Sequence, residues 1–345
     1  MGTFLTVIFY IFIMVLVFGV MVLLHEAGHY FVARRCKIEI KEFSVGMGPK
    51  ILQKKSKKYD TVYSLRLLPI GGYVNMVGED EESDNENAFY KKPVWQRMLV
   101  TAAGPFMNIL LGVLLTLIVV LAQGPLGSTV VAEFDENAVS SEKLAVGDEI
   151  LKIDGTYVFT GNEVLYEIMN KGYEPIDVYV KRDGEKIELK DVSFGIVTEE
   201  GVAFGNMDFK VAREDKNFLT VIKQTASRSL STVKMVYDSL IGLLTGRFGM
   251  NAVSGPIGVA QTVGDAAKTD IVSFLYIGAI LTINLGVFIP FPALDGGRFL
   301  LLCIEAVRRK PINKNIEGYI NFVGLIILFG LMIFITCKDI FKLFG

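Results

Sequence analysis

Four long apolar runs without a charged residue alternate with polar segments along this chain. They cover residues 4–24, 98–127, 271–294 and 318–337. A helix of about 20 apolar residues crosses the hydrocarbon core of a bilayer. The pattern therefore predicts a polytopic α-helical membrane protein with four transmembrane helices. Because the first run lacks a basic segment before it and a small-x-small site after it, we expect a span that continues to about Cys36, not a cleaved signal peptide.

The polar segment between the first two runs, residues 38–97, predicts a membrane-associated β-hairpin region. Residues 63–67 alternate like a strand, and residues 69–74 indicate a turn followed by a second extended piece. This hairpin is either a plain connection or a strand edge that pairs with an unwound substrate. Residues 78–87 are acidic, and we expect them to be mobile.

Residues 128–212 are polar and have the pattern of a separate α+β domain. Asp-Gly pairs at 154–155 and 183–184 are turn signals. The second pair lies inside residues 176–189, which predict a hairpin. We therefore expect a soluble module inserted between the second and third apolar runs.

Residues 217–246 show the 3.6-residue periodicity of an amphipathic helix. Its apolar stripe consists of Ile222, Ala226, Leu230, Val233, Tyr237, Leu240 and Leu244. The stripe suits a helix that lies on the membrane surface, and packing against the preceding module is the alternative. Residues 254–258 then predict a turn, and residues 298–315 a short basic loop.

Composition supports a membrane protein and orients it. Hydrophobic residues make up 51% of the chain, and the mean hydropathy is +0.44. The formal net charge is −2, so we do not expect nucleic acid as a partner. Lysine and arginine gather in residues 38–97 and 298–315, which the positive-inside rule places in the cytoplasm. Both termini and residues 128–212 are then expected outside.

The first apolar run ends in the pattern H-E-x-x-H, formed by His25, Glu26 and His29. Residues i and i+4 share one face of a helix, so both histidines can bind one zinc ion. Glu26 can then act as a general base toward a water at the metal. The chain has only two histidines, so a third protein ligand must be a carboxylate or a cysteine.

Asp295 is the carboxylate that best fits the third position. It follows an apolar run into the sequence Pro290-Phe291-Pro292, and irregular backbone at membrane depth lines a cavity or is buried in protein. Zinc with ionised Glu26 and Asp295 is also neutral overall. A simple helix cap is the alternative for Asp295, and Cys36 or Cys303 are the alternative ligands.

Asn108 is a polar side chain inside the second apolar run, in the sequence Gly104-Pro105-Phe106-Met107-Asn108. A polar side chain in hydrocarbon needs a partner. It either helps two helices to pack or lines the catalytic cavity.

With these residues, the chain resembles the site-2 protease family of intramembrane zinc metalloproteases, and especially bacterial members with four spans and one PDZ domain. The resemblance covers nearly the whole chain. Its motifs are HEAGH (25–29), GGYV (71–74), GPFMN (104–108), GDEILKIDG (147–155), SGPIG (254–258) and PFPALDGGR (290–298).

The resemblance implies roles for matching residues. His25, His29 and Asp295 would bind Zn²⁺, and Glu26 would be the catalytic base. Residues that would line the site or guide substrate are Gly71, Gly72, Tyr73, Asn108, Asn284, Pro290 and Pro292.

Two departures from the family pattern stand out. Val287 occupies the position three residues before Pro290 where the family usually has a substrate-binding Asn, and Asn284 lies one turn earlier. The PDZ-like module has residues 137–141, Asn-Ala-Val-Ser-Ser, in place of the usual Pro-Ala-Ala-Gly run.

The expected activity is hydrolysis of a peptide bond inside transmembrane segments of single-pass proteins, after an upstream protease of the site-1 type has trimmed them. Anti-sigma factors or signal-peptide remnants are the expected substrates. A catalytically silent scaffold that binds exported partners through the PDZ-like domain is the main alternative, and a metal-ion carrier is a weaker one.

The expected organisation has four parts. Residues 1–127 contain the first span, the cytoplasmic hairpin and the second span, and residues 128–212 form the extracytoplasmic PDZ-like domain. Residues 213–270 contain the membrane-surface helix and a connector. Residues 271–345 contain the third span, a cytoplasmic loop and the fourth span.

Overall fold

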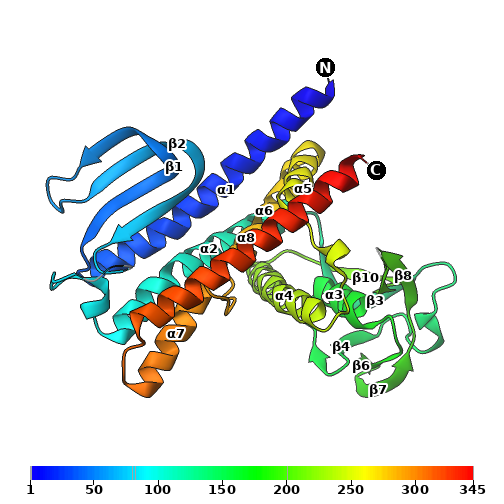
Figure 1. Cartoon of the computed structure of the whole chain (residues 1–345). Coiled ribbons are helices and arrows are strands. Elements are labelled where there is room, and N and C mark those ends of the chain that lie inside the picture. The colour runs from blue at the N-terminus through cyan, green and yellow to red at the C-terminus, as the bar shows by residue number, and fades with distance from the viewer. Residues whose placement is uncertain (1, 80, 82, 200, 345) are drawn as a thin grey trace. The chain divides into compact units, whose positions relative to one another are not determined.

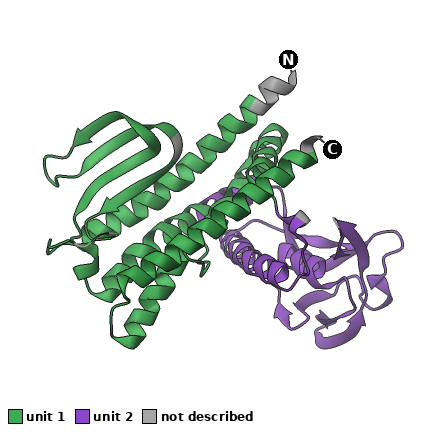
Figure 2. Cartoon of the chain, in the orientation of Figure 1, with its two compact units in different colours: residues 1–112, 254–345 green, residues 113–253 purple. Residues whose placement is uncertain are grey.

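The computed structural model describes residues 2–79, 81, 83–199 and 201–344. The chain divides into two compact units, coloured separately in Figure 2. Unit 1 comprises residues 1–112 and 254–345, and unit 2 comprises residues 113–253. Each unit has its own architecture, and the candidate metal ligands all lie in unit 1.

Long apolar helices dominate unit 1 (Figure 1). In the described part of the chain, three helices are long and apolar enough to cross a membrane. They are α1 (Gly2–Arg35), α2 (Val94–Ala122) and α8 (Lys314–Phe344). They correspond to the first, second and fourth apolar runs, and α2 belongs to unit 1 up to Gly112.

The third apolar run is not one continuous helix. Helix α6 (Ile271–Gly286) has 16 residues and stops before the two prolines. Proline removes a backbone donor and restricts the residue before it, so the Pro290-Phe291-Pro292 segment cannot continue the helix. The 24-residue span predicted for residues 271–294 is therefore divided into α6 and an irregular segment.

Two predictions of irregular structure are wrong. Residues 254–258 do not form an isolated turn, because Pro256 occupies the first position of helix α5 (Pro256–Thr269), where its fixed φ is favourable. The basic loop predicted from residue 298 is largely helix α7 (Asp295–Arg308). Leu302 and Glu305 are buried on one face of α7. This helical spacing was not recognised because basic residues follow it closely in the sequence.

A sheet of two long strands, β1 (Ile40–Lys55) and β2 (Val62–Met76), follows α1. Residues 42–45 of β1 lie between two parts of β2, residues 62–65 on one side and 72–75 on the other. The second half of β1, residues 50–55, then pairs with residues 62–66 from the other side of that segment. The strands can fold back in this way because Gly46, Gly48 and Gly71 have positive φ angles of 82°, 84° and 82°. The predicted hairpin is thus present, but the turn expected at Pro69 is a bend within one continuous strand.

The sheet and the end of α1 share a small core. Ala33, Ile38, Ile40, Val74, Met76, Phe89 and Val100 form this buried cluster. Phe89 belongs to the short helix η1 (Phe89–Lys91), and Val100 lies near the start of α2. The cluster therefore fixes β2 and α2 beside the part of α1 that carries H-E-x-x-H.

Unit 2 contains a mixed module with a five-strand path in the order β10-β3-β4-β6-β7. The strands of this path are β3 (Leu126–Phe134), β4 (Glu149–Ile153), β6 (Ile176–Arg182), β7 (Glu185–Val192) and β10 (Phe209–Glu214). The remaining elements of the module are η2 (Ser140–Glu142), β5 (Thr156–Tyr157), α3 (Gly161–Lys171), β8 (Gly195–Glu199) and β9 (Val202–Asn206). The predicted hairpin is confirmed as β6 and β7, with positive φ angles at Asp183 and Gly184.

Helix α4 (Phe218–Leu244) packs its polar side on this module, and η3 (Met250–Ala252) follows it. The Gln224 side chain donates to the Gly127 carbonyl at 2.9 Å, and the Ser227 and Thr160 hydroxyls lie 2.8 Å apart. Leu230 on the opposite face is 69% exposed. The polar face of this amphipathic helix is therefore the buried one.

Candidate metal centre

Helix α1 presents both histidines to α2 because glycines at the crossing let the backbones approach. An added Cβ at Gly28 would lie 2.8 Å from the Ala103 carbonyl carbon. An added Cβ at Gly104 would lie 2.7 Å from His25 Nε2 and closer still to His29 Nε2. Both positions are therefore too crowded for any larger residue.

Asp295 reaches the same place as the first residue of α7. The chain turns just before it at Ala293, which has a φ of 69°. Gly296 and Gly297 pack against the irregular segment, since added Cβ atoms would lie 2.7 Å from the carbonyl carbons of Ile289 and Phe291 respectively. The Asp-Gly-Gly sequence thus lets the first turn of α7 pack directly on the segment that breaks the third apolar run.

The three side chains have the geometry of a metal site. His25 Nε2 and His29 Nε2 lie 3.1 Å apart, and Asp295 Oδ2 lies 2.8 and 3.3 Å from them respectively. Tetrahedral zinc with bonds of about 2.0–2.1 Å places its ligand atoms about 3.3 Å apart. Two imidazole nitrogens and one carboxylate oxygen are also the donor types that zinc prefers. The residues present therefore fit zinc.

Each histidine has a polar contact at its other ring nitrogen. His29 Nδ1 lies 2.8 Å from the Val100 carbonyl oxygen, which can only accept. The neutral His29 ring is therefore protonated at Nδ1, and Nε2 keeps its lone pair for a metal. His25 Nδ1 lies 3.2 Å from the Asn108 side-chain nitrogen Nδ2. This contact joins α2 to α1, so it agrees with the packing interpretation of Asn108 and also places Asn108 beside a candidate ligand. Asn108 is absent from the described residues that line the cavity.

Glu26 lines the same cavity as the three candidate ligands. This cavity has a volume of about 250 Å³, and Tyr73, Thr101 and Arg298 also line it. Gly72 of β2 lies beside Glu26, because a Cβ added to Gly72 would be 3.5 Å from Glu26 Cγ. The base candidate therefore shares a cavity with the metal ligands and lies beside the backbone of β2.

The predicted site residues divide into two groups. Tyr73 lines the cavity, and Gly71 and Gly72 shape the strand beside it. Asn284, Pro290 and Pro292 are absent from the described residues that line the cavity. The buried Asn284 Oδ1 has no hydrogen-bond partner among the described residues, and Val287 caps α6.

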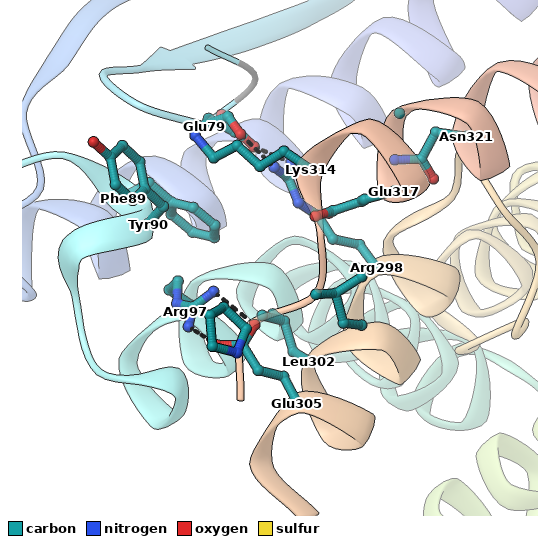
Figure 3. A pocket seen from close by; sticks show the side chains of 13 residues that line it. Glu79, Phe89, Tyr90, Arg97, Arg298, Leu302, Glu305, Lys314, Glu317 and Asn321 are labelled. Carbon is teal, nitrogen blue, oxygen red and sulfur yellow. Dashed lines mark hydrogen bonds and ion pairs between the residues drawn. The ribbon is translucent and has the colours of Figure 1, made fainter. Parts of the chain in front are cut away.

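An ion pair between Glu79 and Arg298 lines the cavity. Arg298 donates to the Glu79 carboxylate and, at 3.2 Å, to its backbone carbonyl. Both residues also line a second, charged cavity of about 510 Å³, shown in Figure 3. There Arg97 forms a two-point ion pair with Glu305, with contacts of 2.5 and 3.1 Å.

Some of these contacts have no clear signal in the sequence. The Val100 carbonyl is a backbone group, so its residue type carries no information about its role. Glu79 lies in the acidic stretch predicted to be mobile, of which residues 80 and 82 lie outside the described residues. Arg298 belongs to the predicted basic loop and ends the motif PFPALDGGR, but neither pattern predicts its ion pair with Glu79.

Two histidines on an apolar helix and an aspartate that follows another apolar helix form a group that could bind one metal ion. The model of peptidase family M50 matches residues 13–331. The chain belongs to this family, the site-2 protease family, and it is a multi-pass intramembrane zinc metalloprotease.

Known relatives are similar to this chain over nearly its whole length. The Regulator of sigma-W protease RasP of Bacillus subtilis is 30% identical, over 96% of this chain and 98% of the relative. Zinc metalloprotease RasP of Geobacillus kaustophilus is 31% identical, over 96% and 97%. Zinc metalloprotease RasP of Bacillus licheniformis is 30% identical, over 96% and 98%.

Proposed function

We propose that this protein cuts transmembrane segments of single-pass membrane proteins whose outer domains have already been removed. The observation that carries this proposal is the convergence of His25, His29 and Asp295, with Glu26 beside them, at the ends of apolar segments. Ionisable residues in such segments are costly and are usually functional.

In this proposal His25, His29 and Asp295 hold zinc, which when bound polarises the scissile carbonyl and lowers the pKa of water. Glu26 accepts a proton from the attacking water and delivers it to the leaving amine. The Glu79–Arg298 ion pair keeps the loop after β2 against α7, whose first residue is Asp295. Gly72 leaves room for Glu26 to face the substrate.

The substrate backbone pairs with the free edge of β2. In the described part of the sheet, residues 72–76 pair with β1 on one side and with no strand on the other. A transmembrane helix satisfies its own backbone, so the scissile region must unwind before the metal can reach a carbonyl. An open strand edge provides replacement hydrogen bonds for the unwound segment.

We further propose the membrane arrangement. Helices α1, α2, α6 and α8 are the four spans, both termini and residues 128–212 are extracytoplasmic, and the metal lies toward the cytoplasmic side. Residues 128–212 form a PDZ-like domain, and residues 213–270 add a membrane-surface helix and a connector. The domain limits at 127, 212 and 270 follow from this assignment.

The substrates that we propose are anti-sigma factors or signal-peptide remnants, made available by an upstream protease of the site-1 type. Support comes from the name of the Bacillus subtilis relative, Regulator of sigma-W protease RasP. Val287 stands where the family usually has an Asn that binds the substrate backbone, so this chain has one polar side chain fewer to hold an unwound substrate.

A substrate that unwinds easily, with glycine or another weak helix former near the cut, is therefore favoured.

The test is co-expression with a single-span reporter that lacks its outer domain. The parent chain is expected to cut the reporter, and Glu26→Gln is expected to leave it intact while retaining zinc. Asp295→Ala is expected to lose both zinc and cleavage. Equal cleavage by the parent and Glu26→Gln would contradict the assignment of Glu26 as the base. Intact reporter with a zinc-loaded parent would favour the scaffold function.

A further inference from the structure

We propose that Asn108 is a positioning residue that holds His25 in the tautomer able to bind zinc. In this arrangement Asn108 Oδ1 accepts a hydrogen bond from His25 Nδ1–H. The inference rests on the ligand set proposed above, and it assigns a specific direction to one hydrogen bond.

Asn108 is placed for this role by its burial and by a polar contact with His25. Its side chain is 1% exposed on α2, and its amide nitrogen Nδ2 lies 3.2 Å from His25 Nδ1. The other end of the amide has no hydrogen-bond partner among the described residues. The contact with His25 is therefore the interaction that fixes how this amide is turned.

The imidazole decides the direction of that contact. His25 Nε2 points toward His29 and Asp295, so Nε2 is the ligand atom and must carry a lone pair. The neutral ring then has its proton on Nδ1, which needs an acceptor. An amide nitrogen at that place would set two hydrogens against each other. The amide oxygen and nitrogen differ by a half-turn of the same group, so the carbonyl can occupy this place.

The second histidine shows the same arrangement with a different acceptor. His29 Nδ1 faces the Val100 carbonyl of the same helix at 2.8 Å. Helix α2 would therefore supply both Nδ1 acceptors, one from its backbone and one from a side chain. Acceptors of this kind orient metal-bound imidazoles, and their loss typically weakens metal affinity 10- to 100-fold.

Two substitutions of Asn108 test whether its side chain accepts a hydrogen bond from His25 or donates one to it. Asn108→Leu has a similar size but cannot form the bond, so we expect zinc affinity to fall at least about tenfold. Asn108→Asp, when ionised, can only accept, and it is expected to restore affinity to within about threefold of the parent. Thr116→Val removes another buried polar group from α2 and is expected to bind zinc like the parent.

Zinc affinity is measured on the full chain in detergent by competition with a chromophoric chelator at pH 8. Asn108→Leu binding as tightly as the parent would overturn the proposal. An Asn108→Asp variant as weak as Asn108→Leu would overturn it too, because the amide would then act as a donor. His25→Ala tests the ligand set separately: retention of parental affinity there contradicts the proposed metal site itself.

A measurement on the parent covers the case in which a variant does not fold. Only two histidines occur in the chain, so selective ¹⁵N labelling gives just four ring-nitrogen signals. In the zinc-loaded protein, His25 is expected to show a protonated Nδ1 that exchanges slowly with solvent. An unprotonated His25 Nδ1 would overturn the proposal.

Discussion

At the scale of single residues, His25 and His29 lie against Gly104, so one added methyl group there is expected to displace both rings. Gly104→Ala should lower zinc affinity about 10- to 100-fold, the range seen when ligand orientation is disturbed. Chelator competition measures this loss. Gly330→Ala in α8 is the matched control, because an added Cβ there meets nothing within 4 Å. Equal affinities of the two variants would contradict the crowding described at Gly104.

Glu42 in β1 gives a second prediction at this scale. Burial acts to raise the pKa of Glu42, but hydrogen bonds from Ser64, Arg66 and Lys50 outweigh it and lower the pKa from 4.5 to about 2. The ionised form therefore stabilises the folded sheet above about pH 4.5. This contribution is lost as the pH falls toward 2.

Hydrogen-exchange protection of peptides from residues 40–76, corrected for the intrinsic rate, measures this effect. The parent should lose protection between about pH 5 and pH 2, and Glu42→Gln should be less protected at pH 7 but change less with pH. Parallel pH profiles for the parent and the variant would rule out Glu42 as the group responsible.

At the scale of elements, the Glu79–Arg298 ion pair connects the loop after β2 to α7. Arg298→Met removes the ion pair from a Glu79 side chain that is 17% exposed, which should cost about 1–3 kcal/mol of unfolding free energy. Thermal unfolding in detergent measures this loss. The double variant with Glu79→Gln should recover part of it, and strictly additive losses would show that the two residues are not coupled.

The exposed apolar face of α4 gives another prediction at this scale. Leu230 is 69% exposed, whereas neighbouring polar side chains such as Ser227 and Ser229 are buried. A spin label at position 230, in a cysteine-free background in vesicles, should be reached by oxygen more readily than by a polar nickel chelate. A label at the exposed Glu185, the first residue of β7, should show the reverse. Similar accessibility at both positions would argue against a membrane-surface helix.

Several elements and part of the site follow from local patterns in the sequence. The i, i+4 spacing on a long apolar run places His25 and His29, and the Pro-x-Pro break before Asp295 indicates where a third ligand could enter. Contacts such as Glu79–Arg298, with Glu79 in an acidic stretch and Arg298 in a basic one, depend on how distant segments pack. Such packing has no local period, which is why the folded-back pairing of β1 and β2 was also not predicted.

At the scale of the whole molecule, the sequence predicts the order of apolar runs better than the exact helices. Three runs match long helices, but the third is shared between α6 and the irregular segment before α7. Charge and hydropathy fix where a chain can cross a membrane, whereas prolines and close glycine contacts decide where the helix stops. The M50 family membership extends over both units, since the matching region covers residues 13–331.

The most direct test of the account is the position of the cut in a purified system. The full chain in vesicles, loaded with zinc, is mixed with a trimmed single-span protein, and mass spectrometry locates the new ends. We expect a cut inside the apolar segment that stops with a chelator, returns when zinc is added and is absent with Glu26→Gln. A cut confined to residues outside the membrane, or one that persists with Glu26→Gln, would contradict the account.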